Sequence, residues 1–146
     1  MKSENEMKLV FLSKSSNEAF ARVAVSAFVS QKDPTVEELS DIKTAVSEAV
    51  TNCIVHAYPD SIGKIELKAT LFDNNTVKIR IRDRGVGIDD VSLAMQPLYT
   101  TGGEERSGLG FSVMESFCDD VRVVSKTGRG TGVTLIKKLS QRVKNG

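Results

Sequence analysis

The sequence predicts an α+β fold in which helices pack on one face of a mixed, mostly antiparallel sheet. Residues 15–31 and 35–56 each begin with a helix-capping signal and continue with apolar residues at helical spacing, whereas several shorter stretches have the pattern of strands. Two of those stretches are separated only by a tight turn, which indicates a hairpin. The 146 residues fit one domain, so we expect a single unit over 1–146.

The first strand is expected over 7–13, and the first helix follows from a capping-box sequence that runs from Ser15 to Glu18. Between Glu18 and Lys32 the only charged residue is Arg22, and apolar residues cover more than one face of the helix. Such a helix is either deeply buried or partly covered by another chain, and the sequence leaves both open. Arg22 is a candidate contact for an acidic group of a partner, or else a surface arginine whose stem lies over apolar neighbours.

The second helix starts at a second capping-box sequence, from Thr35 to Glu38. Apolar residues at three-four spacing predict its buried face, namely Leu39, Ile42, Val46, Ala49 or Val50, and Cys53. Cys53 is therefore expected to be a buried thiol. Because Cys53 and Cys118 have no metal-type spacing, both are expected to be reduced.

The remaining elements are two strands of a hairpin, a long loop, a short helix and two final strands. We expect them, in that order, at 64–72, 76–82, 83–108, 109–117, 121–125 and 131–139, with the hairpin turn at 73–75. Glycine and proline are sparse before residue 83 and concentrated after it. The second half of the chain is therefore where functional loops are expected.

Composition excludes several classes of protein. The 20 basic and 19 acidic residues nearly cancel, which removes the long-range field expected of a protein whose main task is to grip nucleic acid. The first thirty residues lack a signal-peptide pattern, and no apolar run approaches the roughly 20 residues that cross a bilayer. We therefore expect a cytoplasmic protein without direct contacts to nucleic acid or membrane.

Three polar residues of the second helix, Glu48, Asn52 and His56, follow one another at i, i+4 and i+8 and so form a ridge opposite the buried face. The Asn52 side-chain oxygen is a hard ligand suited to Mg²⁺, and Glu48 can accept a proton. A solvated helix face would place the same residues in the same way. For His56, capping of helix carbonyls or interaction with the helix dipole is preferred to a catalytic role.

Asp83, Gly85 and Gly87 follow a strand, at the point where the chain leaves the sheet and turns. Glycines let backbone approach a planar base, and a carboxylate can accept a hydrogen bond from an exocyclic amine such as that of adenine. A glycine-stabilised turn capped by aspartate is the alternative. Near the C-terminus, the glycines around Thr131 either place its side chain to bond a base or its bound water, or simply form a hairpin turn.

The segment 99–111 is polar and rich in glycine before it enters a helix, which predicts a mobile lid. Glycines at the mouth of a helix expose backbone N–H groups that suit a phosphate chain. Arg106 adds a positive fork that can neutralise charge on a terminal phosphate during transfer. A polar loop without a ligand is the alternative. Neither a dinucleotide fingerprint, nor a P-loop, nor the protein-kinase loops occur in the sequence.

The order of these elements resembles the ATP-binding boxes of the gyrase, Hsp90, histidine-kinase and MutL superfamily. The boxes are Glu48-x-x-x-Asn52 on a helix, Asp83-x-Gly85-x-Gly87 after a strand, Gly108-x-Gly110 opening a helix and Gly130-Thr131 before a strand. The resemblance implies a Bergerat-type two-layer α/β sandwich that binds ATP or ADP with Mg²⁺, in which Asn52 holds the metal and Asp83 reads adenine. The nucleotide-binding residues it implies are Asn52, Asp83, Gly85, Gly87, Thr100, Thr101, Ser107, Gly108, Leu109, Gly110, Phe111 and Thr131.

A closer resemblance covers nearly the whole chain. The segments Phe20-Ala21-Arg22-Val23, 46–52, Gln96-Pro97-Leu98 and Glu105-Arg106-Ser107-Gly108 resemble the anti-sigma-F factor family of spore-forming bacteria, although 101–104 looks shorter than that family's pattern. This implies a homodimeric serine-protein kinase that restrains a sigma factor and phosphorylates a serine of an anti-anti-sigma factor, with Glu48 as the base.

Three alternatives stay open. The switch kinases of a general stress sigma factor are the neighbouring family. A binding module would use its nucleotide only to shape a surface for the sigma factor, and an independent ATPase would need no protein acceptor.

Overall fold

The computed structural model describes residues 1–88, 91, 95 and 110–140. Within these residues, five strands form one sheet in the order β1-β2-β3-β5-β4, and every pairing between them is antiparallel. The strands are β1 (Ser3–Leu12), β2 (Lys64–Phe72), β3 (Thr76–Asp83), β4 (Asp120–Lys126) and β5 (Gly130–Lys138). β3 therefore lies at the centre of the sheet, and β1 and β4 form its edges.

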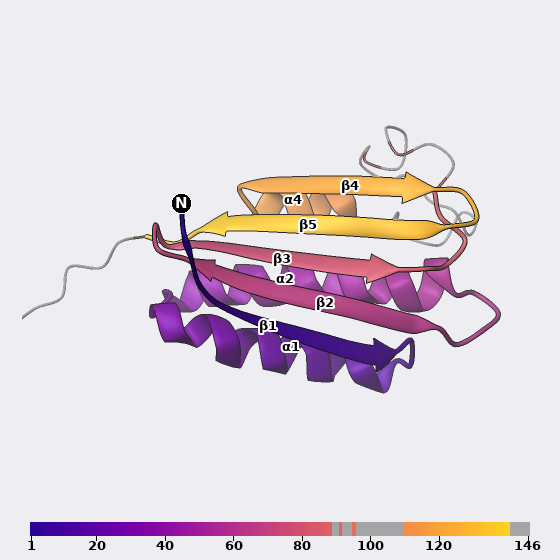
Figure 1. Cartoon of the computed structure of the whole chain (residues 1–146), viewed down its shortest axis with the longest axis horizontal. Coiled ribbons are helices and arrows are strands. Elements are labelled where there is room, and N and C mark those ends of the chain that lie inside the picture. Colours follow the sequence, from indigo (N-terminus) through magenta and orange to yellow (C-terminus); the bar gives the residue numbers. More distant parts are fainter. Residues whose placement is uncertain (89–90, 92–94, 96–109, 141–146) are drawn as a thin grey trace, which may run out of the picture.

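The helices of the described residues lie together on one face of this sheet. They are α1 (Ser16–Val29), α2 (Val36–Asn52) and α4 (Phe111–Phe117), with a 3₁₀ turn η1 (Ser30–Lys32) after α1 and a π-helical turn η2 (Cys53–Ala57) after α2. Figure 1 shows α1, α2 and α4 behind the strands, so the sheet has one covered face and one open face. The predicted α+β fold, with helices on one face of the sheet, is confirmed, but the described pairings are all antiparallel and not mixed as expected.

The core lies between the helices and the covered face of the sheet. Side chains at alternate positions of β2 and β3, such as Ile65, Leu67, Ile79 and Ile81, are buried because successive residues of a strand point to opposite faces. The predicted stripe of α2 meets them: Ile42, Val46, Ala49, Val50 and Cys53 are buried, and Leu39 packs against the cluster. Both cysteines are free thiols, as expected.

The two predicted capping boxes have different outcomes. At the start of α2 the box forms, because the Glu38 N–H donates to Thr35 Oγ1 at 3.0 Å and the Thr35 N–H donates to Glu38 Oε1 at 2.8 Å. At the start of α1 the prediction is wrong. Ser15 has helical backbone angles (φ −56°, ψ −33°) and its side chain makes no cap hydrogen bond, whereas capping requires an extended backbone such as that of Thr35.

The ends of the elements differ from the predicted ones by a few residues. β1 starts at Ser3 rather than at residue 7, because it pairs along the full length of β2 and Ser3 lies opposite Phe72. α1 ends at Val29 rather than at residue 31. The predicted hairpin between β2 and β3 is confirmed, and Asn75 in its turn has a left-handed φ of 60°.

α1 is buried on one side and apolar on the other. Ala21 and Val25 are fully buried, whereas 53% of Phe20 and 62% of Val23 are exposed. The apolar composition of this helix therefore serves the core only in part, and an apolar strip remains on its outer side.

Candidate functional site

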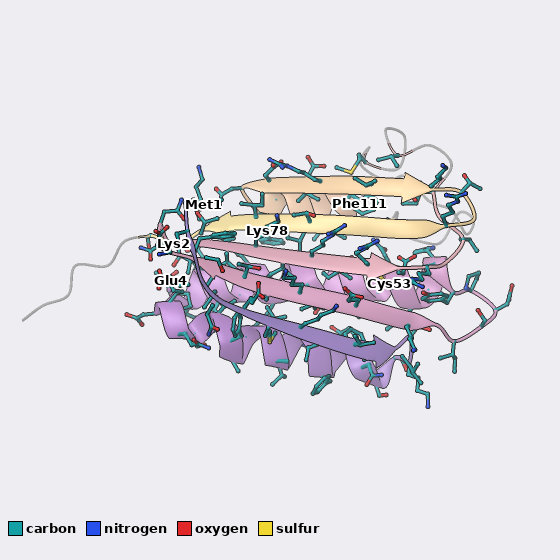
Figure 2. The ribbon with its side chains drawn as sticks, viewed as in Figure 1. Met1, Lys2, Glu4, Cys53, Lys78 and Phe111 are labelled. Atoms are coloured by element: carbon teal, nitrogen blue, oxygen red, sulfur yellow. The ribbon has the colours of Figure 1, made fainter. Side chains whose placement is uncertain are left out.

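A pocket opens on the covered side of the sheet, at the end where β3 stops. Its walls come from the end of α2, η2, the loop after β3, the start of α4 and β5. Cys53 and Phe111, which Figure 2 labels, belong to this wall. The lining residues are Ala49, Asn52, Cys53, His56, Ala57, Asp83, Gly87, Ile88, Phe111, Thr131 and Val133.

Asp83 is the buried carboxylate of this pocket, with 8% of its surface exposed. Its Oδ1 accepts hydrogen bonds from the Gly85 N–H at 2.9 Å and from the Thr131 N–H at 3.2 Å. The Cys53 thiol donates to the other oxygen, Oδ2, at 3.4 Å. Burial raises the pKa of Asp83, although these hydrogen bonds act to lower it. The backbone thus holds Oδ1, and Oδ2 keeps lone-pair capacity for a ligand in the pocket.

The glycines after β3 let this loop pack closely against its neighbours. A Cβ on Gly85 would collide with the Ala57 carbonyl, which accepts a hydrogen bond from the Val86 N–H at 3.0 Å. Gly87 has a φ of 78°, and a Cβ there would collide with the Lys126 carbonyl. Backbone contacts therefore join the loop to η2 on one side and to the end of β4 on the other.

Ser125 connects three parts of the site, although no pattern in the sequence marks it as a site residue. Its Oγ accepts a hydrogen bond from the Ile88 N–H at 2.7 Å, donates to the Gly130 carbonyl at 3.1 Å and lies 2.7 Å from Thr131 Oγ1. In the sequence, Ser125 is only one polar residue of a predicted strand. Its role becomes visible through the β4–β5 register, which places it opposite Thr131.

The polar ridge of α2 faces the pocket. Asn52 and His56 line it and both are partly buried, so a fully solvated helix face is wrong for this part of α2. Glu48, one turn earlier, is also partly buried, and burial raises the pKa of its carboxyl group. A Cβ on Gly110 would collide with Glu48 Oε2, so the carboxylate lies against the start of α4.

Gly110 is the N-cap residue of α4 and has a left-handed φ of 74°. Phe111, the first residue of the helix, is buried in the core. The other residues expected to meet phosphate lie outside the described residues: Thr100, Thr101, Arg106, Ser107, Gly108 and Leu109. Arg22 is on α1 and does not line the pocket. It is not the isolated charge that we expected, because it forms an ion pair with Glu18 at 3.3 Å.

These features fit a planar heterocycle that carries an exocyclic amine. Ala49, Ile88 and Val133 supply apolar walls, and Asp83 Oδ2 supplies an acceptor at the buried end. The part of the chain that the structure describes has no group of three or more His, Cys, Asp or Glu side chains placed to hold a metal ion. Asn52 fits an ion such as Mg²⁺ only as one ligand among phosphate oxygens and water, which is how Mg²⁺ is commonly held beside nucleotides.

The family described as histidine kinase-like ATPase domain matches residues 12–143 of the chain. The anti-sigma F factor of Caldanaerobacter subterraneus is 54% identical over 142 residues, which cover 97% of this chain and 99% of that relative. The anti-sigma F factor of Pasteuria penetrans is 57% identical over 137 residues, which cover 92% of this chain and 91% of that relative. The similarity thus extends over nearly the full length of both proteins.

Solved structures share the fold at low sequence identity. The structure of the RsbU and RsbW domains of Rv1364c from Mycobacterium tuberculosis matches with a TM-score of 0.71 at 20% identity, covering 96% of this chain and 34% of that one. The mycobacterial sensor histidine kinase MprB matches with a TM-score of 0.58 at 13% identity, covering 92% of this chain and 100% of that one. Among the described residues, no helix combines the length and the apolar character needed to span a membrane.

Proposed function

Because this chain belongs to the anti-sigma F factor family of histidine kinase-like ATPases, we propose that it binds and inhibits the sporulation sigma factor sigma-F and, with ATP and Mg²⁺, phosphorylates a serine of its anti-anti-sigma factor. It acts as a homodimer of one nucleotide-binding domain over 1–146, in the cytoplasm. Phosphorylation inactivates the antagonist, so the same molecule restrains the sigma factor and removes the protein that would release it.

The observation that carries the nucleotide part of this proposal is the arrangement around Asp83. A buried carboxylate is costly unless it is paired, and two backbone N–H groups and one thiol hold this one in a fixed orientation. Its remaining acceptor capacity faces a pocket with apolar walls. This is the environment that an adenine ring with its exocyclic amine requires, and a solvated turn would not need to bury the charge.

The kinase part of the proposal assigns separate tasks to the residues around this pocket. Asn52 supplies one ligand to Mg²⁺, which when bound with ATP neutralises charge on the phosphates. Glu48 accepts the proton of the serine hydroxyl. Its raised pKa makes it a stronger base than an ordinary glutamate. Arg106 neutralises charge on the terminal phosphate, and the glycine-rich segment that ends at Gly110 supplies backbone N–H groups to the phosphate chain.

The surface proposed to meet the protein partners is the outer side of α1. Phe20 and Val23 are exposed there, and Arg22 keeps 39% of its side chain exposed despite its ion pair with Glu18. An apolar strip beside a cation suits a partner that offers apolar and acidic groups together. Charge reversal at Arg22 is expected to weaken binding of the sigma factor and to leave ATP affinity unchanged.

The experiment that tests the proposed function is incubation with labelled ATP, Mg²⁺ and a candidate anti-anti-sigma factor. We expect label on the partner's serine, loss of Mg²⁺-dependent ATP binding in Asn52→Ala, and loss of transfer with retained binding in Glu48→Gln. Normal transfer by Glu48→Gln contradicts the assignment of the base. If nucleotide binds but nothing is labelled, the protein is a binding module, and if phosphate is released without an acceptor, it is an independent ATPase.

A further inference from the structure

A row of cations follows the central strand on the open face of the sheet. The apolar residues of β3 point to the helices, so the alternate residues Lys78, Arg80 and Arg82 project from the open face, and Arg84 continues the alternation just after the strand. All four residues are exposed. Figure 2, viewed onto the open face, labels Lys78 among the side chains in front of the sheet. We call these four residues the basic stripe.

The carboxylates on the neighbouring strands do not neutralise this stripe, because each is paired with another cation. Glu66 contacts Lys8 at 3.2 Å, and Glu6 contacts Lys68 at 3.5 Å. On β4, Asp120 contacts the nearby Arg122 at 2.9 Å. Within the described ranges, no residue of the basic stripe forms an ion pair with a carboxylate.

The accumulation of cations has a cost to the fold. Lys68 lies directly opposite Arg80 in the β2–β3 register, and Lys8 lies directly opposite Lys68 in the β1–β2 register. Like charges that face each other across antiparallel strands destabilise the pair. The carboxylates on this face, Glu6, Glu66 and Asp120, form their ion pairs with Lys68, Lys8 and Arg122, so the four cations of the basic stripe remain as excess positive charge. The pattern therefore indicates a ligand of negative charge.

The open face is also hollowed where β3 ends. The hollow is lined by Val10, Lys64, Glu66, Arg82, Asp83, Arg84, Gly128 and Arg129. Lys64 and Arg129 thus join Arg82 and Arg84 around a concave surface in which cations outnumber carboxylates, because, of the two acidic lining residues, Glu66 is paired with Lys8 and Asp83 is buried. A concave surface with an excess of one sign of charge concentrates the electrostatic potential. Asp83 is the only described lining residue that this hollow shares with the nucleotide pocket, which opens on the covered side of the sheet.

We propose that the basic stripe and this hollow dock an acidic, extended segment of a partner protein. Alternate residues of a strand lie about 6.6–6.8 Å apart, and an extended segment with acidic residues at alternate positions has the same repeat. The arginine guanidinium groups match carboxylates in a two-pronged geometry. The surface is separate from α1, so the proposal does not depend on phosphate transfer or on the identity of the sigma factor.

The chemistry of the open face favours a protein over a nucleic acid. Val10 is 58% exposed, Leu12 42% and Val124 76%, and the strand register places all three on this face, where apolar side chains of a protein can cover them. Sheets that bind single-stranded nucleic acid present aromatic side chains on which bases stack. Among the described strands, the only aromatic residue on the open face is Phe72, at the opposite end of β2 from the hollow.

The test uses the whole chain and two fluorescent ten-residue peptides, one alternating glutamate with valine and the other alternating glutamine with valine. Fluorescence anisotropy is expected to show binding of the glutamate peptide only, with affinity that falls between about 50 and 200 mM salt. The double reversal Lys78→Glu/Arg80→Glu is expected to weaken this binding at least tenfold. The single reversal Arg80→Glu is compared with the matched control Lys43→Glu, which makes the same change in net charge on α2, on the covered side of the sheet, and is expected to leave binding within twofold.

Three results overturn the proposal: equal binding of the two peptides, no binding of either, or an equal loss in the control variant. A single-stranded oligodeoxynucleotide of the same charge that binds more tightly than the glutamate peptide, and is released by the Lys78→Glu/Arg80→Glu change, identifies a nucleic-acid surface instead. Thermal unfolding checks that the Lys78→Glu/Arg80→Glu variant is folded. Because the change removes like-charge contacts, the melting temperature of the variant is expected to be at least that of the parent. ATP affinity, which should stay unchanged, provides the same check at the nucleotide pocket.

Discussion

Replacing Asp83 with asparagine separates the role of this residue in the fold from its role toward the nucleotide. The amide keeps the size of the side chain, and its oxygen can go on accepting hydrogen bonds from the Gly85 and Thr131 N–H groups. Its NH₂ group then takes the place of Oδ2. There it faces the Cys53 thiol and, in the proposed complex, the exocyclic amine of adenine, and both of these groups are donors.

The two expected effects have opposite signs. A hydrogen bond to a charged group contributes about 1.5–3 kcal/mol, so ATP affinity should fall roughly 10- to 150-fold. Burial raises the pKa of Asp83 in the folded state, so the stability that this group contributes is present below the ordinary aspartate pKa and is lost as pH rises through the raised value. Asparagine does not ionise, so the variant does not lose this stability as pH rises. The free energy of unfolding at pH 7 is therefore expected to stay level or to rise.

Titration calorimetry and urea unfolding measure these two effects. ATP is compared with purine riboside triphosphate, which lacks the exocyclic amine: the parent should prefer ATP, and Asp83→Asn should lose that preference. Asp83→Ala is the matched control, because it leaves the Gly85 and Thr131 N–H groups unpaired at about 1–3 kcal/mol each and should destabilise the fold. Parent-like ATP affinity in Asp83→Asn, or destabilisation as large as that of Asp83→Ala, would refute the reasoning.

Four further predictions concern other parts of the site and fold. The rate of phosphate transfer should fall as pH drops through the raised pKa of Glu48, which lies above the range of an ordinary glutamate. In a pH–rate profile, the Glu48→Gln variant should lack this decrease at low pH, and its rate should be about 10²–10⁴-fold lower. Gly85→Ala drives a Cβ into a backbone carbonyl of η2 and should lower the free energy of unfolding by about 1–3 kcal/mol, whereas Gly132→Ala, whose Cβ would make only ordinary contacts, should be neutral in the same urea titration. Thr35→Ala removes the cap of α2 and should cost about 0.5–2 kcal/mol in thermal unfolding. Although burial opposes it, hydrogen bonds lower the pKa of Glu38, so the stability it adds should be lost as pH falls below the ordinary glutamate range.

Much of the fold follows from local signals in the sequence. The apolar spacing of α2 predicts its buried face because burial of that stripe stabilises the helix against the sheet. The cap at Thr35 forms, whereas the similar sequence at Ser15 does not. The difference lies in the incoming chain: the Asn17 side chain donates to the Leu12 carbonyl at 2.9 Å, and the backbone at Ser15 is already helical, so the serine oxygen cannot reach the N–H group it would cap.

The site is harder to predict because its parts meet only in three dimensions. The helical pattern predicts that Cys53 is buried, but its contact with Asp83 joins residues that are 30 positions apart. Ser125 has no signal of its own, because its importance depends on the pairing of β4 with β5 and on the loop after β3. The ordered set of boxes names segments that supply lining residues to one pocket, namely Asn52, Asp83, Gly87, Phe111 and Thr131. A family pattern includes which segments occur together, whereas the periodicity of a single sequence reports only neighbours along the chain.

The division of charge across the sheet also affects how the molecule meets others in solution. A formal net charge of +1 describes a nearly neutral particle, but the open face presents the basic stripe to solvent. Because the Debye length is about 8 Å at physiological ionic strength, an approaching macromolecule interacts with the charges of the nearest face and not with the net charge of the whole protein. Collisions are therefore biased in orientation before any contact forms, and acidic surfaces that approach the strands are retained longer than those that approach the helices.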